Sequence, residues 1–178
     1  SNDTWIGVPL CVHRRCLDPM FSIANKIAYQ GMMYNSTITK EPEIRLQTRF
    51  LHVTGRVDGR HYVPEQGELV LKLLLDEILG SDKLPDVFVI SPFAEIPHKL
   101  KVKLQKSLQE ILKPDKENSN ILHDWLKSHV GTVHTFQGKQ ASGVILCLGL
   151  DDQSKGAASW ASSKPNLLNV ALTRAKHR

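Results

Sequence analysis

The sequence predicts an α/β protein in which helices flank a parallel β-sheet. Two observations support this fold class. Short runs of β-branched and apolar residues alternate with longer amphipathic stretches along the chain. The run DVFVIS at 86–91 is almost continuously apolar, which is typical of a strand buried on both faces of a parallel sheet. Strand–helix alternation implies right-handed crossovers, so ligands are expected at the carboxyl ends of the strands.

The first half of the chain gives four elements. A strand is expected at 9–12. A helix is expected at 18–31, because an Asp-Pro start and a Gly stop enclose an apolar face. RFLHVTG at 49–55 reads as a strand that ends in a turn. The clearest helix is 64–80, which has acidic residues early and a Gly stop. The surrounding residues 35–66 are less regular and are expected to form a surface excursion.

The second half repeats the alternation. The pattern predicts the buried strand at 86–91, a helix with a basic face at 98–112, a polar loop at 113–120, strands at 131–136 and 143–150, and a loop followed by a helix over 163–178. We treat residues 1–178 as one domain.

Composition limits the class of protein. The chain has 178 residues, of which 41% are apolar and 23% are charged, as in ordinary soluble domains. No apolar run approaches the roughly 20 residues of a membrane span, and the first residues lack the pattern of a signal peptide. We therefore expect no membrane partner and a cytoplasmic or nucleoid-associated location, not secretion. The net charge of +5 favours a polyanionic partner such as nucleic acid.

The cysteines argue against a metal centre. Cys11, Cys16 and Cys147 are an odd and sparse set, as expected of reduced thiols in the cytoplasm. Cys11 and Cys16 lie close to His13, but a fourth ligand cluster is missing. We expect no metal site.

The stretch GTVHTFQGKQ at 131–140 superficially resembles a phosphate-binding loop. Such a loop needs four residues between its glycines and a Ser or Thr after the lysine. Here six residues separate Gly131 from Gly138, and Gln140 follows Lys139. No G-x-x-x-x-G-K-[ST] occurs anywhere in the chain, so the stretch needs another explanation.

Four stretches together supply that explanation. They resemble, in order and spacing, the second RecA-like domain of superfamily I helicases, in the branch that contains the nonsense-mediated-decay helicase. Residues 12–31 (VHRRCLDPMFSIANKIAYQG) resemble the Gln-Tyr-Arg-Met-His-Pro element, and residues 87–96 (VFVISPFAEI) resemble motif IV. Residues 131–150 (GTVHTFQGKQASGVILCLGL) resemble motif V, and residues 166–178 (NLLNVALTRAKHR) resemble motif VI. The resemblance covers nearly the whole chain. It implies a three-layer RecA-like sheet, that is, a P-loop NTPase fold without its own P-loop.

In that family ATP lies between two RecA-like domains. The first domain supplies the P-loop and the carboxylates that bind Mg²⁺, and the second supplies arginines that stabilise charge on the γ-phosphate. By this resemblance the arginine fingers are Arg15 and Arg174. Arg14 remains an alternative to Arg15, because the following residues depart from the Met-His pattern. A surface salt bridge, or for Arg174 a cation at a helix end, is the structural alternative.

The resemblance also assigns binding residues. Gln137, Gly138 and Gln140 are expected on the nucleotide side, although the family commonly has Glu where Gln140 stands. Gln retains hydrogen bonding but lacks the charge, and a simple polar residue at a strand–loop junction is the alternative. The expected contacts to single-stranded nucleic acid are Ser91, Pro92, Phe93, Thr132 and Thr135.

Alternatives remain open for the nucleic-acid contacts. Phe93 also fits a core aromatic, and Thr132 and Thr135 also fit strand formers. The histidines His13 and His134 are interpreted as structural. The basic helix, with Lys99, Lys101, Lys103 and Lys106, is either a solvated face or a nucleic-acid contact.

The resemblance predicts a C-terminal motor lobe of a nucleic-acid-dependent ATPase or helicase. We expect the chain to be a fragment whose final strand lies beyond it and whose sheet edge is therefore incomplete. Its expected partners are the first RecA-like domain of the same polypeptide and single-stranded DNA or RNA. The first RecA-like domain, which this chain does not contain, would make most of the contacts to ATP and Mg²⁺. The isolated fragment is therefore expected to hydrolyse no ATP. A non-catalytic nucleic-acid-binding module and a scaffold domain are the alternatives.

Overall fold

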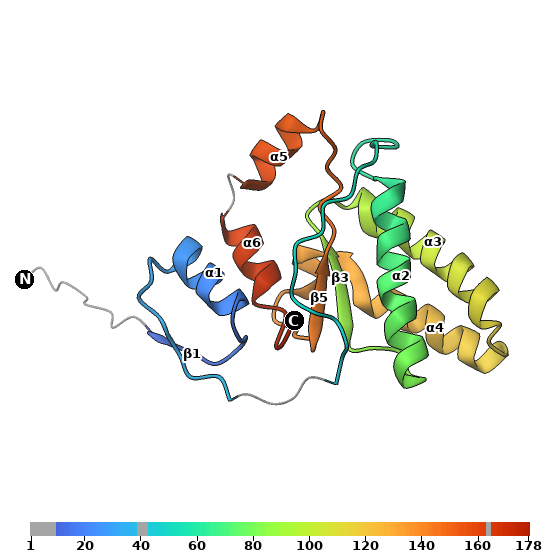
Figure 1. Cartoon of the computed structure of the whole chain (residues 1–178), viewed down its shortest axis with the longest axis horizontal. Helices are drawn as coiled ribbons and strands as arrows, with labels where there is room; N and C mark the ends of the chain where they lie inside the picture. Colours follow the sequence, from blue (N-terminus) through green and yellow to red (C-terminus); the bar gives the residue numbers. More distant parts are fainter. Residues whose placement is uncertain (1–9, 39–42, 163–164) are drawn as a thin grey trace, which may run out of the picture.

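The computed structural model describes residues 10–38, 43–162 and 165–178 (Figure 1). At its centre is a parallel sheet in which β3 (Val87–Ser91) lies between β4 (Val130–Thr132) and β5 (Gly143–Leu146). Ile90 of β3 pairs with Gly131 of β4 and with Leu146 of β5. Both pairings are parallel, so the carboxyl ends of the three strands lie at the same edge of the sheet. Every residue of β3 is buried, which confirms the strand predicted from the apolar run at 86–91.

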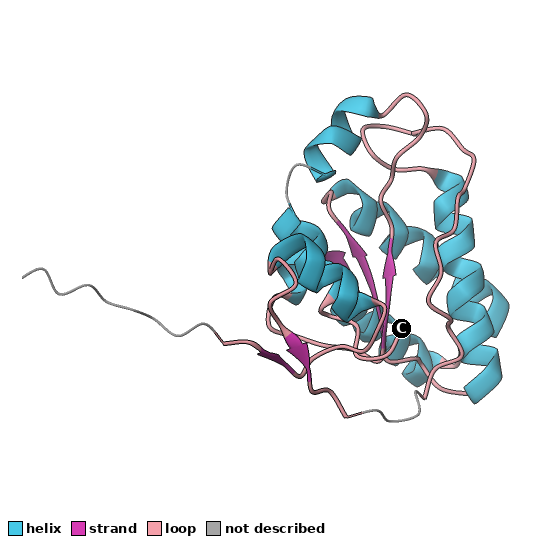
Figure 2. Ribbon diagram, turned by 60° about the vertical axis from the view of Figure 1, so that its left-hand side comes forward, coloured by secondary structure: helices cyan, strands magenta, loops and turns pink. Residues whose placement is uncertain are grey.

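Helices cover both faces of this sheet, and the predicted α/β fold with flanking helices is confirmed (Figures 1 and 2). One face packs against the longer helices through fully buried residues that include Leu74, Leu100 and Leu126. The opposite face packs through Phe88, Ile90 and Ala171. Burying each large apolar side chain stabilises the fold by about 1.5–3 kcal/mol. The first layer comprises α2 (Pro64–Ser81), α3 (Glu95–Leu112) and α4 (Lys116–His129), and the second comprises α1 (Met20–Ala28) and α6 (Pro165–Leu172).

The N-terminal residues form a small separate sheet. The strand β1 (Val12–His13) pairs in parallel with β2 (Tyr34–Asn35). It overlaps the strand predicted at 9–12 in one residue only, and Pro9 lies outside the described residues. The helix α1 follows, and the Asp18 carboxylate accepts a hydrogen bond from the Ser22 backbone N–H at its start. It ends before the predicted Gly31, which has a φ of +78°.

The strand predicted at 49–55 is wrong. These residues form no helix or strand, and the Phe50 side chain is 84% exposed. A cavity of about 800 Å³ separates the segment from β5, so the backbones do not pair there. A side chain ties its end instead, because Asp151 accepts a hydrogen bond from the Val57 backbone N–H. A β-rich composition without a partner strand does not make a strand.

The two strands predicted at 131–136 and 143–150 are shorter than expected. After Thr132 the chain turns into the 3₁₀ helix η1 (Val133–Phe136). β5 ends at Leu146, although the Cys147 backbone N–H still donates to Ile90. Beyond it the Gln66 side chain accepts from the Gly149 backbone N–H, where φ is +62°. Side chains therefore replace the ladder at both strand ends.

One predicted helix is confirmed, and the helices differ from the prediction in three places. The predicted helix at 64–80 is confirmed by α2. The helix α3 begins at Glu95, three residues before the predicted start. This earlier start is possible because Pro97 falls in the first turn, where a proline is tolerated. The polar loop predicted at 113–120 is wrong from Lys116 onward, since Asp115 caps α4 by accepting from the Asn118 backbone N–H. The helix α5 (Lys155–Ser162) also lies where none was predicted.

The last residues of the chain run along the outer edge of β5. Ala141 and Ala175 form a parallel bridge, and the Val144 backbone N–H donates to the Arg178 carbonyl. The Leu17 backbone N–H donates to the Lys176 carbonyl, which ties this segment to the N-terminal layer. Among the described residues, no helix combines the length and apolar character needed to cross a membrane.

Candidate functional site

Two of the predicted nucleic-acid residues meet at the carboxyl edge of the sheet. Ser91 ends β3 and pairs in register with Thr132, which ends β4. Ser91 is 1% exposed, and its Oγ accepts a hydrogen bond of 3.3 Å from the Phe93 backbone N–H. The Ser91 hydroxyl therefore holds the turn that follows β3. This edge is where parallel sheets bind ligands.

Thr132 and Thr135 form a reciprocal cap around η1. The Thr132 side chain accepts from the backbone of Thr135, and Thr135 Oγ1 accepts from the Thr132 backbone N–H at 3.2 Å. The two hydroxyl oxygens lie 3.1 Å apart. The alternative that both residues only favour strand formation is wrong for Thr135. Their hydroxyls lie on the solvent-accessible side of a fixed turn.

Phe93 has both a core contact and a ring contact. It packs against the core beneath α2 and α3, and half-buried Pro92 precedes it. Its ring stacks on the His61 imidazole, with centroids 3.9 Å apart and planes at 12°. His61 was missed by the sequence reasoning because it lies in the irregular region 35–66, where periodicity gives no signal.

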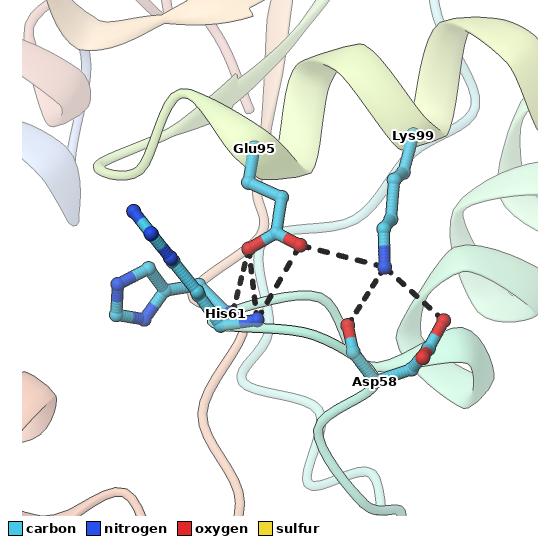
Figure 3. A network of polar contacts seen from close by, with 5 residues as sticks. Asp58, His61, Glu95 and Lys99 are labelled. Atoms are coloured by element: carbon cyan, nitrogen blue, oxygen red, sulfur yellow. Dashed lines mark hydrogen bonds and ion pairs between the residues drawn. The ribbon is translucent and has the colours of Figure 1, made fainter.

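The loop that carries His61 is anchored to the start of α3 (Figure 3). The Glu95 carboxylate accepts hydrogen bonds from the backbone N–H groups of Arg60 and His61, at 3.1 and 2.9 Å. Lys99 Nζ donates to the Asp58 carbonyl and carboxylate, at 2.8 and 3.1 Å, and also pairs with Glu95. Partial desolvation raises the pKa of Glu95, but these hydrogen bonds outweigh it and leave that pKa below its ordinary value.

Carboxylates therefore partly neutralise the predicted basic face of α3. Lys99 pairs with Asp58 and Glu95, and Lys103 pairs with Glu68 of α2. The hydrogen bond to Asp58 is the main reason that the pKa of Lys99 is raised. Two of the four lysines thus connect α3 to neighbouring elements. These ion pairs argue against a nucleic-acid contact for Lys99 and Lys103.

Arg174 is buried against the loop that follows η1. It is 4% exposed and lies just beyond α6. Its guanidinium donates to the carbonyls of Phe136, Lys139 and Val170 at 3.4, 3.0 and 3.1 Å. Burial, and then the nearby positive charge of Arg15, lower the pKa of Arg174. Arg174 therefore does not face solvent, whereas its bond to the Val170 carbonyl in the last turn of α6 fits the alternative of a cation at a helix end.

Arg15 lies on the same side as Arg174. Its backbone carbonyl accepts a hydrogen bond of 3.4 Å from Gln140 Nε2. Arg14 and Arg15 are both exposed, but Arg15 is the residue whose charge lowers the pKa of Arg174. Arg14 and Arg15 lie in a turn that a buried hydrogen bond closes, because the Cys16 backbone N–H donates to His13 Nε2 at 3.0 Å. His13 thus has the structural role that the sequence indicated.

Gly138 and Gln137 complete this side of the molecule. Gly138 has a φ of +85°, a conformation that side-chain-bearing residues adopt only with strain. A Cβ at Gly138 would meet no described atom within 4 Å, so the backbone conformation accounts for the glycine. Gln137 is exposed beside it. Arg15, Arg174, Gln137, Gly138 and Gln140 are thus assembled around the single loop between η1 and β5.

A comparison with the sequence models of known families identifies the family of the chain. The sequence model of a family described as an AAA domain matches residues 9–178. The chain belongs to this family. This AAA domain is of the type found in superfamily I helicases, which supports the resemblance given above. No curated protein matches the chain.

Membership makes the AAA domain a helicase-type ATPase module, and such modules use ATP and Mg²⁺. The AAA domain lacks a G-x-x-x-x-G-K-[ST] loop. Within the described residues, no group of three or more His, Cys, Asp or Glu side chains could hold a metal ion. Without this loop sequence, the chain's own residues do not fit the side of an ATP site where a P-loop cradles the phosphates.

Proposed function

We propose that the chain is the second RecA-like lobe of a superfamily I helicase, in the branch that contains the nonsense-mediated-decay helicase. It would supply Arg15 and Arg174 to ATP bound by a first lobe, and it would hold single-stranded nucleic acid along its sheet edge. The observation that supports this best is the grouping of Arg15, Gln140 and Arg174 around one loop. The two arginines repel each other, and an anion between the lobes would relieve that repulsion.

The proposed chemistry is electrostatic. Phosphoryl transfer spreads negative charge over the transferred group, and a guanidinium held in place stabilises it. ATP would supply the γ-phosphoryl group, with Mg²⁺ and the P-loop provided by the first lobe. In this chain Gln140 holds the Arg15 backbone, and backbone carbonyls hold Arg174. Such arginines contribute about 10³ to 10⁵ in rate.

The same loop offers a route between nucleotide and nucleic acid. Arg174 donates to the carbonyl of Phe136, whose neighbour Thr135 is locked to Thr132. A movement of the guanidinium toward a phosphate would remove hydrogen bonds from the end of η1. We infer that this would alter the position of the threonine hydroxyls and hence the contact with the nucleic-acid backbone.

The arginine roles can be tested in a protein that joins this chain to a first lobe with an intact P-loop. Arg15→Ala is expected to lower kcat by about 10³ or more. Arg14→Ala is the matched control, because it removes a neighbouring exposed guanidinium, and it should stay within a few-fold of wild type. A larger loss with Arg14→Ala would transfer the role to Arg14. Unchanged kcat in Arg15→Ala and Arg174→Ala together would contradict the proposal.

The binding roles need a separate test. Thr132→Ala should weaken binding of a single-stranded oligonucleotide, while ATP affinity is retained. The slope of affinity against salt should stay unchanged, because a neutral hydroxyl neutralises no phosphate charge. The same variant should affect homopolymers of different bases equally, because phosphate contacts carry no sequence information. A loss of ATP affinity without a loss of oligonucleotide affinity would contradict this division of roles.

A non-catalytic nucleic-acid-binding module is the second candidate. Gln140 supports it, because the resembled family commonly has a carboxylate there. The two candidates differ in one measurement, which is oligonucleotide-stimulated ATP hydrolysis by the two-lobed protein. The motor proposal expects stimulation, and the binding-module proposal expects binding without hydrolysis. In both cases the isolated 178-residue chain is expected to hydrolyse no ATP.

A further inference from the structure

Outside the proposed phosphate contacts, the sheet edge carries one pair of rings that the sequence reasoning did not connect. His61 stacks on Phe93 with a centroid separation of 3.9 Å and nearly parallel planes. Both side chains are half-buried, so the pair lies at the surface of the core and is not enclosed within it. Phe93 contacts the core on one side. His61 is the outer ring of the stack.

The His61 backbone is held by more contacts than packing a surface ring requires. Its N–H donates to Glu95 at 2.9 Å, and the preceding N–H donates to the same carboxylate. The turn is closed by a bridge between Asp58 and Tyr62, and it requires Gly59, which has a φ of +87°. Figure 3 shows the His61 ring directed away from the Glu95 carboxylate that holds its backbone.

Gly149 makes a further contact with the loop that carries His61. A Cβ at Gly149 would lie 2.0 Å from the His61 carbonyl oxygen and 2.1 Å from the Ile96 side chain. The His61 backbone therefore rests directly on Gly149, and only a residue without a side chain permits this approach. Glu95 and Gly149 together place the imidazole from two directions. A ring held in this way loses little freedom when a ligand stacks on it.

The position of the ring pair indicates the ligand. The Phe93 backbone N–H donates to Ser91, and Ser91 pairs with Thr132, so the rings adjoin the edge proposed to contact phosphates. Arg60 is exposed beside His61. The carboxylates of Asp58 and Glu95, which would repel phosphate, are paired with Lys99. Flat rings next to cations suit a nucleobase together with its phosphate.

We propose that His61 and Phe93 form a stacking platform for one base of a single-stranded nucleic acid, with Glu95 and Gly149 as positioning residues. This inference rests on the proposed function, because it assumes that the strand crosses this edge. It adds a base contact to the phosphate contacts of Thr132 and Thr135. Stacking accepts any base, so the platform would not select a sequence.

The experiment measures binding of a fluorescent oligothymidylate to the 178-residue chain at low salt. His61→Ala is expected to weaken binding about tenfold, since stacking one base contributes roughly 1–3 kcal/mol. His61→Phe keeps a ring at the same place and should retain wild-type affinity within a few-fold. His123→Ala, an exposed histidine on α4, is the matched control and should have no effect. Equal affinity of His61→Ala and wild type would overturn the platform.

An abasic oligonucleotide separates stacking from a merely structural effect. His61→Ala should bind the abasic strand as well as wild type does, because no base is present to stack. Equal weakening with both strands would overturn the platform, since the variant would then disturb the phosphate contacts. Deoxyribose and ribose oligonucleotides should lose affinity alike, whereas a loss confined to one would overturn a purely stacking contact. If the wild-type chain bound no oligonucleotide, the proposed nucleic-acid function would fail together with the platform.

Gly149→Ala tests the positioning without touching the rings. The added methyl group displaces the His61 backbone and should weaken binding of the normal oligonucleotide while sparing the abasic one. Gly156→Ala is the matched glycine control, because a Cβ there meets no described atom within 4 Å. The platform would be contradicted if Gly149→Ala, shown by circular dichroism to be folded, bound both strands as wild type does.

Discussion

The side-chain amide of Gln140 donates a hydrogen bond to the backbone carbonyl of Arg15 at 3.4 Å. The two residues are far apart in the sequence, and the contact joins the loop after η1 to the turn after β1. An ionised carboxylate could not make this bond, because it has no proton to donate. Gln140, one of the residues at which the chain departs from the resembled family, is therefore the residue that holds the backbone of the proposed arginine.

We expect Gln140→Ala to loosen the turn that carries Arg14 and Arg15. Trypsin cleaves after arginine, and cleavage depends on local opening of the backbone. The rate of cleavage after Arg15 should rise several-fold in Gln140→Ala. Gln137→Ala, which changes the neighbouring exposed glutamine, should leave it unchanged. Equal rates in the two variants and wild type would show that the bond does not restrain the turn.

Arg174→Ala should destabilise the chain even without nucleotide. It removes the donors to the carbonyls of Phe136, Lys139 and Val170. Leaving buried acceptors without partners lowers the free energy of unfolding by about 1–3 kcal/mol. Arg174→Lys should recover only part of this, because an ammonium lacks the planar fork. Urea denaturation measures the difference, and Arg14→Ala, on the surface, should stay within about 0.5 kcal/mol of wild type.

Gly138→Ala should lower stability by about 1–2 kcal/mol through the backbone alone. The φ of +85° is strained for any residue with a Cβ, while the surrounding space is open. Gly156→Ala, in the helix α5, should not be destabilising, because alanine has the higher helix propensity. Thermal unfolding of both variants gives the comparison. A Gly138→Ala protein as stable as wild type would mean that the loop adopts another conformation in solution.

Acid should weaken the anchor of the His61 loop. Hydrogen bonds hold the pKa of Glu95 below its ordinary value of 4.5, so its contribution is present above that pH. The contribution is lost as the pH falls through the lower, folded-state pKa. The free energy of unfolding should therefore decline less steeply below about pH 5 in Glu95→Gln than in wild type. Parallel pH profiles of the two proteins would assign the acid sensitivity to other carboxylates.

Local signals in the sequence predict much of the fold. α2 was predicted because acidic residues early in the segment and a glycine near its end are typical of a helix. The helix α4 was missed because its first turn is polar, although Asp115 supplies a cap signal that could have revealed it. The shortening of the strand at 131–136 depends on hydroxyl bonds between Thr132 and Thr135, and strand propensity does not report such bonds.

The site was predictable only where its residues lie in stretches that resemble the helicase motifs. The resemblance grouped Gln137, Gly138 and Gln140, and the structure places Arg15 and Arg174 around the same loop. Their roles remain predictions. His61 could not have been found, because its position depends on Glu95 and Gly149, which lie on separate elements. Tertiary contacts of this kind leave no periodic signal.

The pairing of the last residues with both the sheet and the N-terminal layer sets an order for folding during synthesis. Ala175 is buried with Cys16, Met20 and Phe21, and the Lys176 carbonyl accepts from the Leu17 backbone N–H. Helix α1 is therefore synthesised long before residues 175 and 176, and it cannot dock until they follow it. Its apolar face stays exposed while the residues between α1 and Ala175 are synthesised, which makes this layer prone to aggregation or chaperone binding in the nascent chain.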